Sequence, residues 1–310
     1  MTTTSGSSVL AVVLAAVGAV FFGLASVRQH GAVRATAAPA RSSLGAQVVA
    51  GLRLLKHPTW IIGAVQALLG GGLHVVALAL APITLVQPVG VLAVPVTVVA
   101  SALARRRRPA PTQVLGTLLS VAGVAALTVV LLLPAAQPAT LPAWRTLATG
   151  VGAVLVGGGV VVLLLVRASM LLRCVSRAVV AAAFFGLNSI LIRTLGEVFA
   201  ARPDHATGLV VTSLVGLGLA LPLGIWAMQS AYLFGSPQVV ICCLTLIDPL
   251  TAVVGGRLLL QDGATITGTT AAVAVVCALV AAVGVVLLAR DYPVEPGPEL
   301  AGVTTDARSA

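Results

Sequence analysis

Residues 8–27 read SVLAVVLAAVGAVFFGLASV, a run of 20 residues without a charged side chain. As an α-helix this run is about 30 Å long, which matches the hydrocarbon core of a bilayer. Unpaired backbone groups are costly in lipid, so such a run is expected to cross the membrane as a helix. Because no basic residue precedes it, we expect a retained first transmembrane helix, with cleavage after residues 37–40 as the alternative.

The rest of the chain has the same character. Of its 310 residues 59% are hydrophobic and 8% are charged, whereas roughly a quarter of the residues in a soluble domain are charged. The composition predicts an all-α polytopic membrane protein. Eight further apolar runs bring the expected number of spans to nine: 60–80, 83–104, 112–133, 146–166, 178–199, 207–229, 237–258 and 264–289.

Residues 44–57 are the uncertain segment. Gln47, Arg53 and Lys56 interrupt its apolar residues, and it is short for a crossing. We predict an amphipathic segment on the membrane surface, and a tenth span is the alternative. If the segment does cross, Arg28, Arg34 and Arg41 move to the other side, and the bias of basic residues toward one side weakens.

The net charge of +10 has a topological explanation. A nucleic-acid-binding protein gathers its basic residues on a soluble face, whereas here they form short clusters between apolar runs, such as Arg105 to Arg108. Cytoplasmic loops collect Lys and Arg. We therefore expect no nucleic-acid partner, a plasma (inner) membrane location, an external N-terminus and a cytoplasmic C-terminus.

An internal repeat divides the chain. Three pairs of short matches keep their order along the sequence: FFGLAS at 21–26 with FFGLNS at 184–189, VPVTVV at 94–99 with DPLTAV at 248–253, and Gly116-Thr117 with Gly268-Thr269. Their offsets are 163, 154 and 152 residues. Because 83–104 and 237–258 cross in opposite directions in the nine-span arrangement, we predict two inverted repeats. Halves of this kind can open a central site to either side of the membrane in turn.

This repeat sets the expected domain organisation. We expect a short N-terminal tail (1–7), a first transmembrane repeat (8–166), a cytoplasmic linker (167–177), a second transmembrane repeat (178–289) and a disordered C-terminal tail (290–310).

Over most of residues 8–290 the chain resembles the EamA-like drug/metabolite transporter superfamily. The resemblance lies in the pattern Ala77 to Pro82, followed by a short turn and a helix reaching Pro95, and in a second copy from Ala231 through Pro249 to Leu260–Gly263. It implies a transporter without a cofactor, working by alternating access.

Within that superfamily, His57–Gly63 followed by Ala81–Gly90 is similar to the NIPA-type magnesium transporter branch. The similarity is partial. Where that branch carries an acidic residue before the Ala-Pro turn, this chain has Gly70-Gly71-Gly72, and Arg105 to Arg108 stand where an acid follows the next helix.

Asp248 is the most conspicuous candidate site residue. A carboxylate near the middle of a span is costly unless it is neutralised or paired, and Pro249 follows it directly. We interpret Asp248 as a proton-coupling or cation-contacting group. The alternative is an acid that stabilises a kink in the helix.

Other polar or helix-breaking residues lie inside the apolar runs. His74 either contacts the substrate or is a neutral histidine satisfied by a neighbouring helix. The remaining path candidates are Gln87, Asn188 and Gln229, for which hydrogen bonding between helices is the alternative. Pro88, Pro95 and Pro249 are the candidate helix breaks. No catalytic set, paired carboxylates or metal-binding cluster is evident in the sequence, so we expect no enzyme activity, no cofactor and no metal centre.

The leading functional hypothesis is a secondary transporter or exporter of a small metabolite or drug-like solute, with coupling to protons as one option. A permease for magnesium or another divalent cation is one alternative. A non-transporting membrane scaffold or lipid-handling protein is the other. The expected partners are a small solute or ion and the lipid bilayer.

Overall fold

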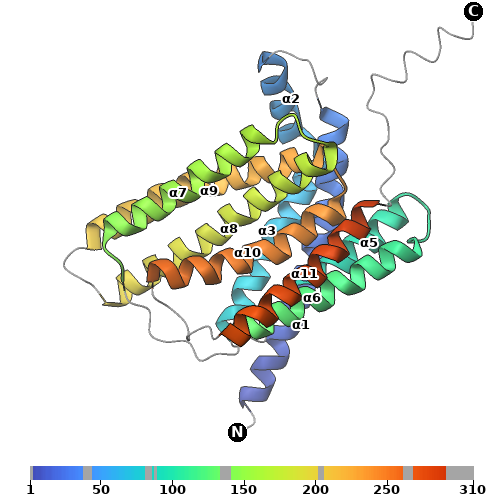
Figure 1. Cartoon of the computed structure of the whole chain (residues 1–310). Coiled ribbons are helices and arrows are strands. Elements are labelled where there is room, and N and C mark those ends of the chain that lie inside the picture. The colour runs from blue at the N-terminus through green and yellow to red at the C-terminus, as the bar shows by residue number, and fades with distance from the viewer. Residues whose placement is uncertain are drawn as a thin grey trace, which may run out of the picture.

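The computed structural model describes residues 3–37, 44–80, 86, 89–132, 141–201, 206–260 and 268–290, and within these ranges the regular structure is entirely helical (Figure 1). The helices are α1 (Thr3–Thr36), α2 (Leu44–Lys56), α3 (Pro58–Leu80), α5 (Ala93–Ala104), α6 (Pro111–Leu132), α7 (Trp144–Leu164), α8 (Met170–Ala201), α9 (Ala206–Tyr232), α10 (Pro237–Leu260) and α11 (Gly268–Arg290). In the described ranges, eight helices are long and apolar enough to cross a membrane. The prediction of an all-α polytopic membrane protein is confirmed.

The expected span 83–104 is not one continuous helix. Within the described residues, a turn at Val91 and Leu92 precedes α5, which is apolar but shorter than the other spans. Proline has no amide hydrogen, so Pro95 cannot donate to the carbonyl of Val91 four residues earlier. The amide of Val94 donates to that carbonyl instead, at 3.0 Å, and α5 starts afresh with Pro95 in its first turn.

Two helices extend beyond their predicted limits. α1 continues past residue 27 to Thr36, and α8 begins at Met170, so most of the expected linker 167–177 is helical. An uncharged apolar run ends at the first arginine, whereas a helix continues until its backbone is interrupted. The predicted tail 290–310 begins at the last residue of α11 and otherwise lies outside the described residues.

α2 is the segment whose crossing was uncertain. Its 13 residues are about 20 Å long as a helix, which is too short to span the hydrocarbon core. Its packing partners in the described structure are α1 and α3, and it projects from one end of the bundle (Figure 1). Leu52 and Leu55 are each 55% exposed beside Arg53 and Lys56, as expected for a surface amphipathic helix.

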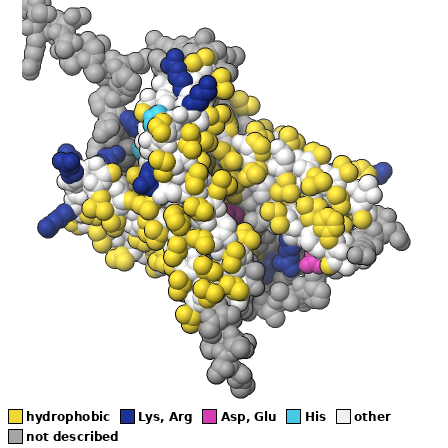
Figure 2. All heavy atoms as spheres, turned by 180° about the vertical axis from the view of Figure 1, so that it is seen from behind, with side chains coloured by type: hydrophobic (Ala, Val, Ile, Leu, Met, Phe, Trp, Pro, Cys, Tyr) yellow, Lys and Arg dark blue, Asp and Glu magenta, His cyan; other side chains and the backbone are white. Residues whose placement is uncertain are grey.

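The end of the bundle beside α2 is rich in arginine, and we call it the basic end. α1, α5 and α11 finish there, α8 begins there, and Arg34, Arg105, Arg173, Arg177 and Arg290 lie on these helix ends (Figure 1). In the view from behind, Lys and Arg side chains gather mainly on one side of a largely apolar surface (Figure 2). α1 starts at the opposite end, as an odd number of crossings requires.

The repeat reappears as a pair of close approaches between helices. A Cβ atom added to Gly23 of α1 would lie 2.9 Å from the carbonyl oxygen of Ala93 on α5. At the equivalent position of α8, a Cβ on Gly186 would lie 2.7 Å from the carbonyl oxygen of Asp248 on α10. Each glycine thus lets one motif of its half approach the helix that carries the other motif.

A second pair of contacts extends the repeat to α3 and α9. A Cβ on Gly70 of α3 would lie 3.3 Å from the Cβ of Phe21, and one on Gly224 of α9 would lie 3.3 Å from the Cβ of Phe184. The two phenylalanines are equivalent at an offset of 163 residues, and the two glycines at 154. α3 therefore corresponds to α9, with the same offset that relates α5 to α10.

The third sequence match is corrected by the packing of α6 on α11. A Cβ on Gly116 would lie 2.9 Å from the carbonyl oxygen of Gly284, and one on Gly123 would lie 2.8 Å from that of Cys277. Pairing each residue of α6 with the residue 161 positions later matches Gly116 with Cys277 and Gly123 with Gly284. Under this pairing, the contact between Gly116 and Gly284 corresponds to the contact between Cys277 and Gly123. Gly116 thus corresponds to Cys277, whereas Gly268 merely begins α11. The dipeptide Gly-Thr was too short to fix the helical register.

The same contacts show the direction of the two halves. Because an early residue of α6 meets a late residue of α11 and the reverse also holds, the two helices run antiparallel. Equivalent helices that run in opposite directions make the repeats inverted, as predicted.

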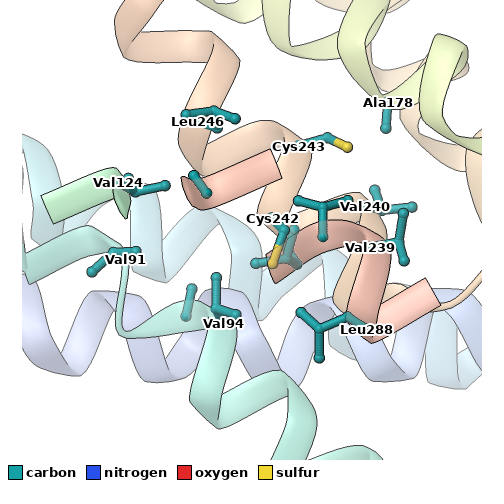
Figure 3. Packing of buried hydrophobic residues seen from close by; sticks show 14 of the residues in the cluster. Val91, Val94, Val124, Ala178, Val239, Val240, Cys242, Cys243, Leu246 and Leu288 are labelled. Carbon is teal, nitrogen blue, oxygen red and sulfur yellow. The ribbon is translucent and has the colours of Figure 1, made fainter. Parts of the chain in front are cut away.

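The largest buried cluster lies where the two halves meet. It joins residues of α5, α6, α10 and α11, among them Val94, Val124, Cys242, Leu246 and Leu288 (Figure 3). A second cluster holds α7, α8 and α9 together. α10 belongs to the interface between the halves, and this position makes its polar residues candidates for function.

Candidate functional site

Asp248 lies in the middle of α10, where this helix packs against α8. Gly186 permits the approach, because a Cβ there would lie 2.7 Å from the carbonyl oxygen of Asp248 and 2.7 Å from the Cβ of Thr251. The Asp248 side chain is partly buried and makes neither an ion pair nor a hydrogen bond with any part of the chain that the structure describes. Its charge is therefore available to a ligand or a proton.

Pro249 adds a second oxygen near this carboxyl group. α10 is continuous through Pro249, but the proline has no amide hydrogen to donate to the carbonyl of Thr245. The Thr245 hydroxyl donates backward to the carbonyl of Ile241 at 3.0 Å. Within one turn, α10 thus offers a carboxylate and a carbonyl that lacks its helical donor, and oxygen atoms of both kinds bind hard cations.

Acidic residues are rare in the described helices. Asp248 and Glu197 are the acids in the described ranges, and no group of three His, Cys, Asp or Glu side chains is close enough there to hold a metal ion. Acidic surface is visible at two places in the view from behind, one of them in a hollow between apolar surfaces (Figure 2). A cation at Asp248 would meet one carboxylate rather than a cage of them.

A buried set of polar side chains joins the two halves near the basic end. Gln229 of α9 donates from Nε2 to Oε1 of Gln29 on α1, at 3.0 Å. Tyr232 donates its hydroxyl to Oγ of Ser26, also at 3.0 Å, and its ring meets His30 edge to face at 5.9 Å. All five residues are buried, and we call this set the polar bridge.

Gln229 was the one member of the polar bridge that the sequence indicated. Gln29 and His30 were missed because the predicted span ended at residue 27, which left both in a loop, and Ser26 was noted only as part of the repeat. Their spacing of three and four residues places them on one face of α1 if the helix is extended. Gln229 and Tyr232, three apart, form the matching face on α9.

Among the described residues, the polar bridge has no equivalent at the opposite end of the bundle. By the repeat, α8 and α3 are the counterparts of α1 and α9, yet α3 and α8 make at most scattered contacts. Ser26 is 2% exposed, whereas its counterpart Ser189 is exposed. Ile192 and Val75, the counterparts of the two glutamines, are 61% and 66% exposed. In the described structure α1 and α9 are therefore joined by polar side chains near the basic end, whereas their counterparts α8 and α3 are apart at the other end.

Two further predicted path residues, Asn188 and His74, are described, and neither is brought together with Asp248. Asn188 is buried, and neither atom of its amide has a partner in the described structure. It lies about 200° around α8 from Gly186, the residue that meets α10. His74 is on α3, which packs along α1 and makes no extended contact with α10. Gln87 and Pro88 lie outside the described residues.

Comparison with known proteins adds one finding. A family model described as magnesium transporter NIPA matches residues 7–192, and this match confirms the resemblance noted in residues 57–63 and 81–90. No curated protein and no solved structure matches the chain. The matched region contains the whole first repeat and most of α8, and it ends before the part of the chain that holds Asp248 and Gln229.

Proposed function

We propose that this chain, which belongs to the NIPA magnesium transporter family, moves a divalent cation across the membrane, with Asp248 as the charged group on its path. The family and the eight long apolar helices make the protein a multi-pass membrane transporter. One observation carries the finer proposal. Asp248 is a mid-span carboxyl group without a partner in the described structure, one turn from a carbonyl that Pro249 leaves without its helical donor.

A single carboxylate suits magnesium in a particular form. Mg²⁺ loses its water reluctantly, so proteins commonly bind it through one or two carboxylates while it keeps several waters. The acids available in the described helices fit this mode better than a fully dehydrated site. We propose that Asp248 contacts a largely hydrated cation.

A proton-coupled transporter of a small solute is the second candidate. It is favoured by the amide and hydroxyl groups of the polar bridge, which suit a neutral polar solute better than a bare cation. In this case Asp248 would exchange a proton between the two sides. The membership of the family supports either transport function over a scaffold without transport activity.

Alternating access is the mechanism that the inverted repeats favour. The polar bridge joins α1 to α9 near the basic end, whereas their counterparts α8 and α3 make at most scattered contacts in the described structure. We propose that the polar bridge is a gate. Because basic loops are retained in the cytoplasm, the gate would be the inner one and the conformation would face outward.

The two candidates differ in what they move. We would reconstitute the full chain in liposomes that enclose a magnesium-sensitive dye, and in matched liposomes that enclose a pH-sensitive dye. Magnesium entry that needs no proton gradient supports the cation proposal. Proton movement that depends on a metabolite from a test panel, without magnesium entry, would replace it with the second candidate.

A further inference from the structure

Two arginines near the start of α8 stack on one aromatic ring. The guanidinium carbon of Arg173 lies 3.8 Å from the centre of the Phe234 ring, and that of Arg177 lies 4.5 Å from it. Arg177 also donates from Nη1 to the carbonyl oxygen of Arg173, at 3.1 Å. Phe234 belongs to the segment that links α9 to α10, so this segment is attached to the first turns of α8.

Among the described residues these arginines have no acidic partner. Arg177 is only 6% exposed, and Nε of Arg173 is buried without a hydrogen-bond partner in the described structure. Neither forms an ion pair there, and the two described acids, Asp248 and Glu197, lie on distant turns of α10 and α8. Burying one charge beside a like charge is costly unless an anion compensates. The arrangement therefore suits an anion between the two guanidinium groups.

The surroundings indicate which anion fits. Met170, Leu171 and Leu172, in the turn that precedes Arg173, are each exposed by between 43% and 46%, so exposed apolar surface lies beside the two arginines. Because α8 begins at the basic end, Arg173 and Arg177 lie where this helix enters the apolar part of the bundle. The positive N-terminus of α8 adds to the attraction for an anion. An anionic group that also carries acyl chains would pair with the arginines through its charge and cover the apolar side chains beside them.

We propose that Arg173 and Arg177, held by Phe234, bind the phosphate group of an anionic phospholipid. Arginine pairs with phosphate in a forked, two-bond geometry, which makes it the suitable residue for such a headgroup. Phe234 is two residues from Tyr232 of the polar bridge, so a lipid bound here contacts the segment that continues directly from the proposed gate. The binding itself does not depend on which solute is transported.

The test is lipid binding by the full chain, measured by native mass spectrometry with phosphatidylglycerol and phosphatidylcholine as probes. The wild type should retain phosphatidylglycerol in preference to phosphatidylcholine. Arg173→Gln with Arg177→Gln should weaken phosphatidylglycerol binding at least about tenfold, because charge-assisted bonds are lost. Arg167→Gln is the matched control, since Arg167 is exposed nearby without such stacking, and it should bind as the wild type does. Equal binding by the double variant and the wild type overturns the proposal.

Two further arms identify the source of the anion. Millimolar inorganic phosphate should not displace the lipid; if it displaces it completely, the site serves soluble phosphate and the lipid assignment fails. The acidic tail is tested by a full-length variant with Asp291→Asn, Glu295→Gln, Glu299→Gln and Asp306→Asn. This variant should bind lipid as the wild type does. A large gain in lipid affinity would show that the tail occupies the site.

A conservative variant protects the test against misfolding. Arg173→Lys with Arg177→Lys keeps both charges but loses the flat groups that stack on Phe234 and fork around phosphate. We expect binding between that of the wild type and that of the glutamine variant. If the lysine variant binds as tightly as the wild type, general attraction to a basic surface explains the lipid and the proposed site is wrong.

Discussion

At the residue scale, the functional argument depends on a few polar groups in an apolar molecule. A hydrogen bond within a membrane protein contributes about 1 kcal/mol, so the bonds of the polar bridge can hold two halves together and still be broken during transport. Asp248 differs from them because no described group neutralises it. The bridge is suited to opening and closing, and Asp248 is suited to binding a charge.

The bond between Tyr232 and Ser26 can be tested by a double-mutant cycle. Tyr232→Phe and Ser26→Ala should each lower the free energy of unfolding, and the two effects should be coupled by about 1 kcal/mol. Ser189→Ala is the control, because Ser189 is the exposed counterpart of Ser26 and donates only within its own helix. Additive effects of Tyr232→Phe and Ser26→Ala, measured by reversible denaturation in detergent, would show that the hydroxyl groups do not interact.

At the element scale, glycine contacts determine how closely the helices approach. Gly23 and Gly186 let α1 and α8 meet α5 and α10 at equivalent places, and Gly70 and Gly224 do the same for the phenylalanine pairs. Small residues have this role in membranes because helix association there depends on close packing.

Replacing Gly186 should disturb α10 at Asp248. Gly186→Ala places a methyl group 2.7 Å from a backbone oxygen, so we expect a loss of about 1–3 kcal/mol in stability together with reduced transport. Gly152→Ala in α7 is the matched control, because a Cβ there has open space and alanine favours the helix. Thermal unfolding of both variants measures the difference, and equal stability would contradict the close approach of α8 and α10.

At the scale of the whole molecule, the sequence predicted the class of fold, most of the spans and the inverted repeat, because long apolar runs and the FFGLAS match are local signals. Pro95 was among the candidate helix breaks, but the span 83–104 was still expected to be continuous, and the extension of α1 to Gln29 and His30 was not predicted. Runs of apolar residues mark the membrane, whereas helix ends and contacts between halves depend on packing that spans some 200 residues of sequence, as between Gln29 and Gln229.

Topology is the first test at this scale. If the basic end faces the cytoplasm, a cysteine introduced as Thr4→Cys should react with an impermeant reagent from outside the cell, and one introduced as Ser309→Cys only after the membrane is permeabilised. An even number of crossings would make both positions react from the same side.

Magnesium flux through the Asp248→Asn variant tests the central claim most directly. In liposomes with an enclosed magnesium-sensitive dye, the wild type should admit Mg²⁺, and Asp248→Asn should reduce the initial rate at least about tenfold because it removes the charge but keeps the size of the side chain. Asp248→Glu should retain part of the rate, and Glu197→Gln, at the other described acid, should leave it unchanged. Magnesium entry through Asp248→Asn at the wild-type rate would contradict the assignment of Asp248 to the cation path.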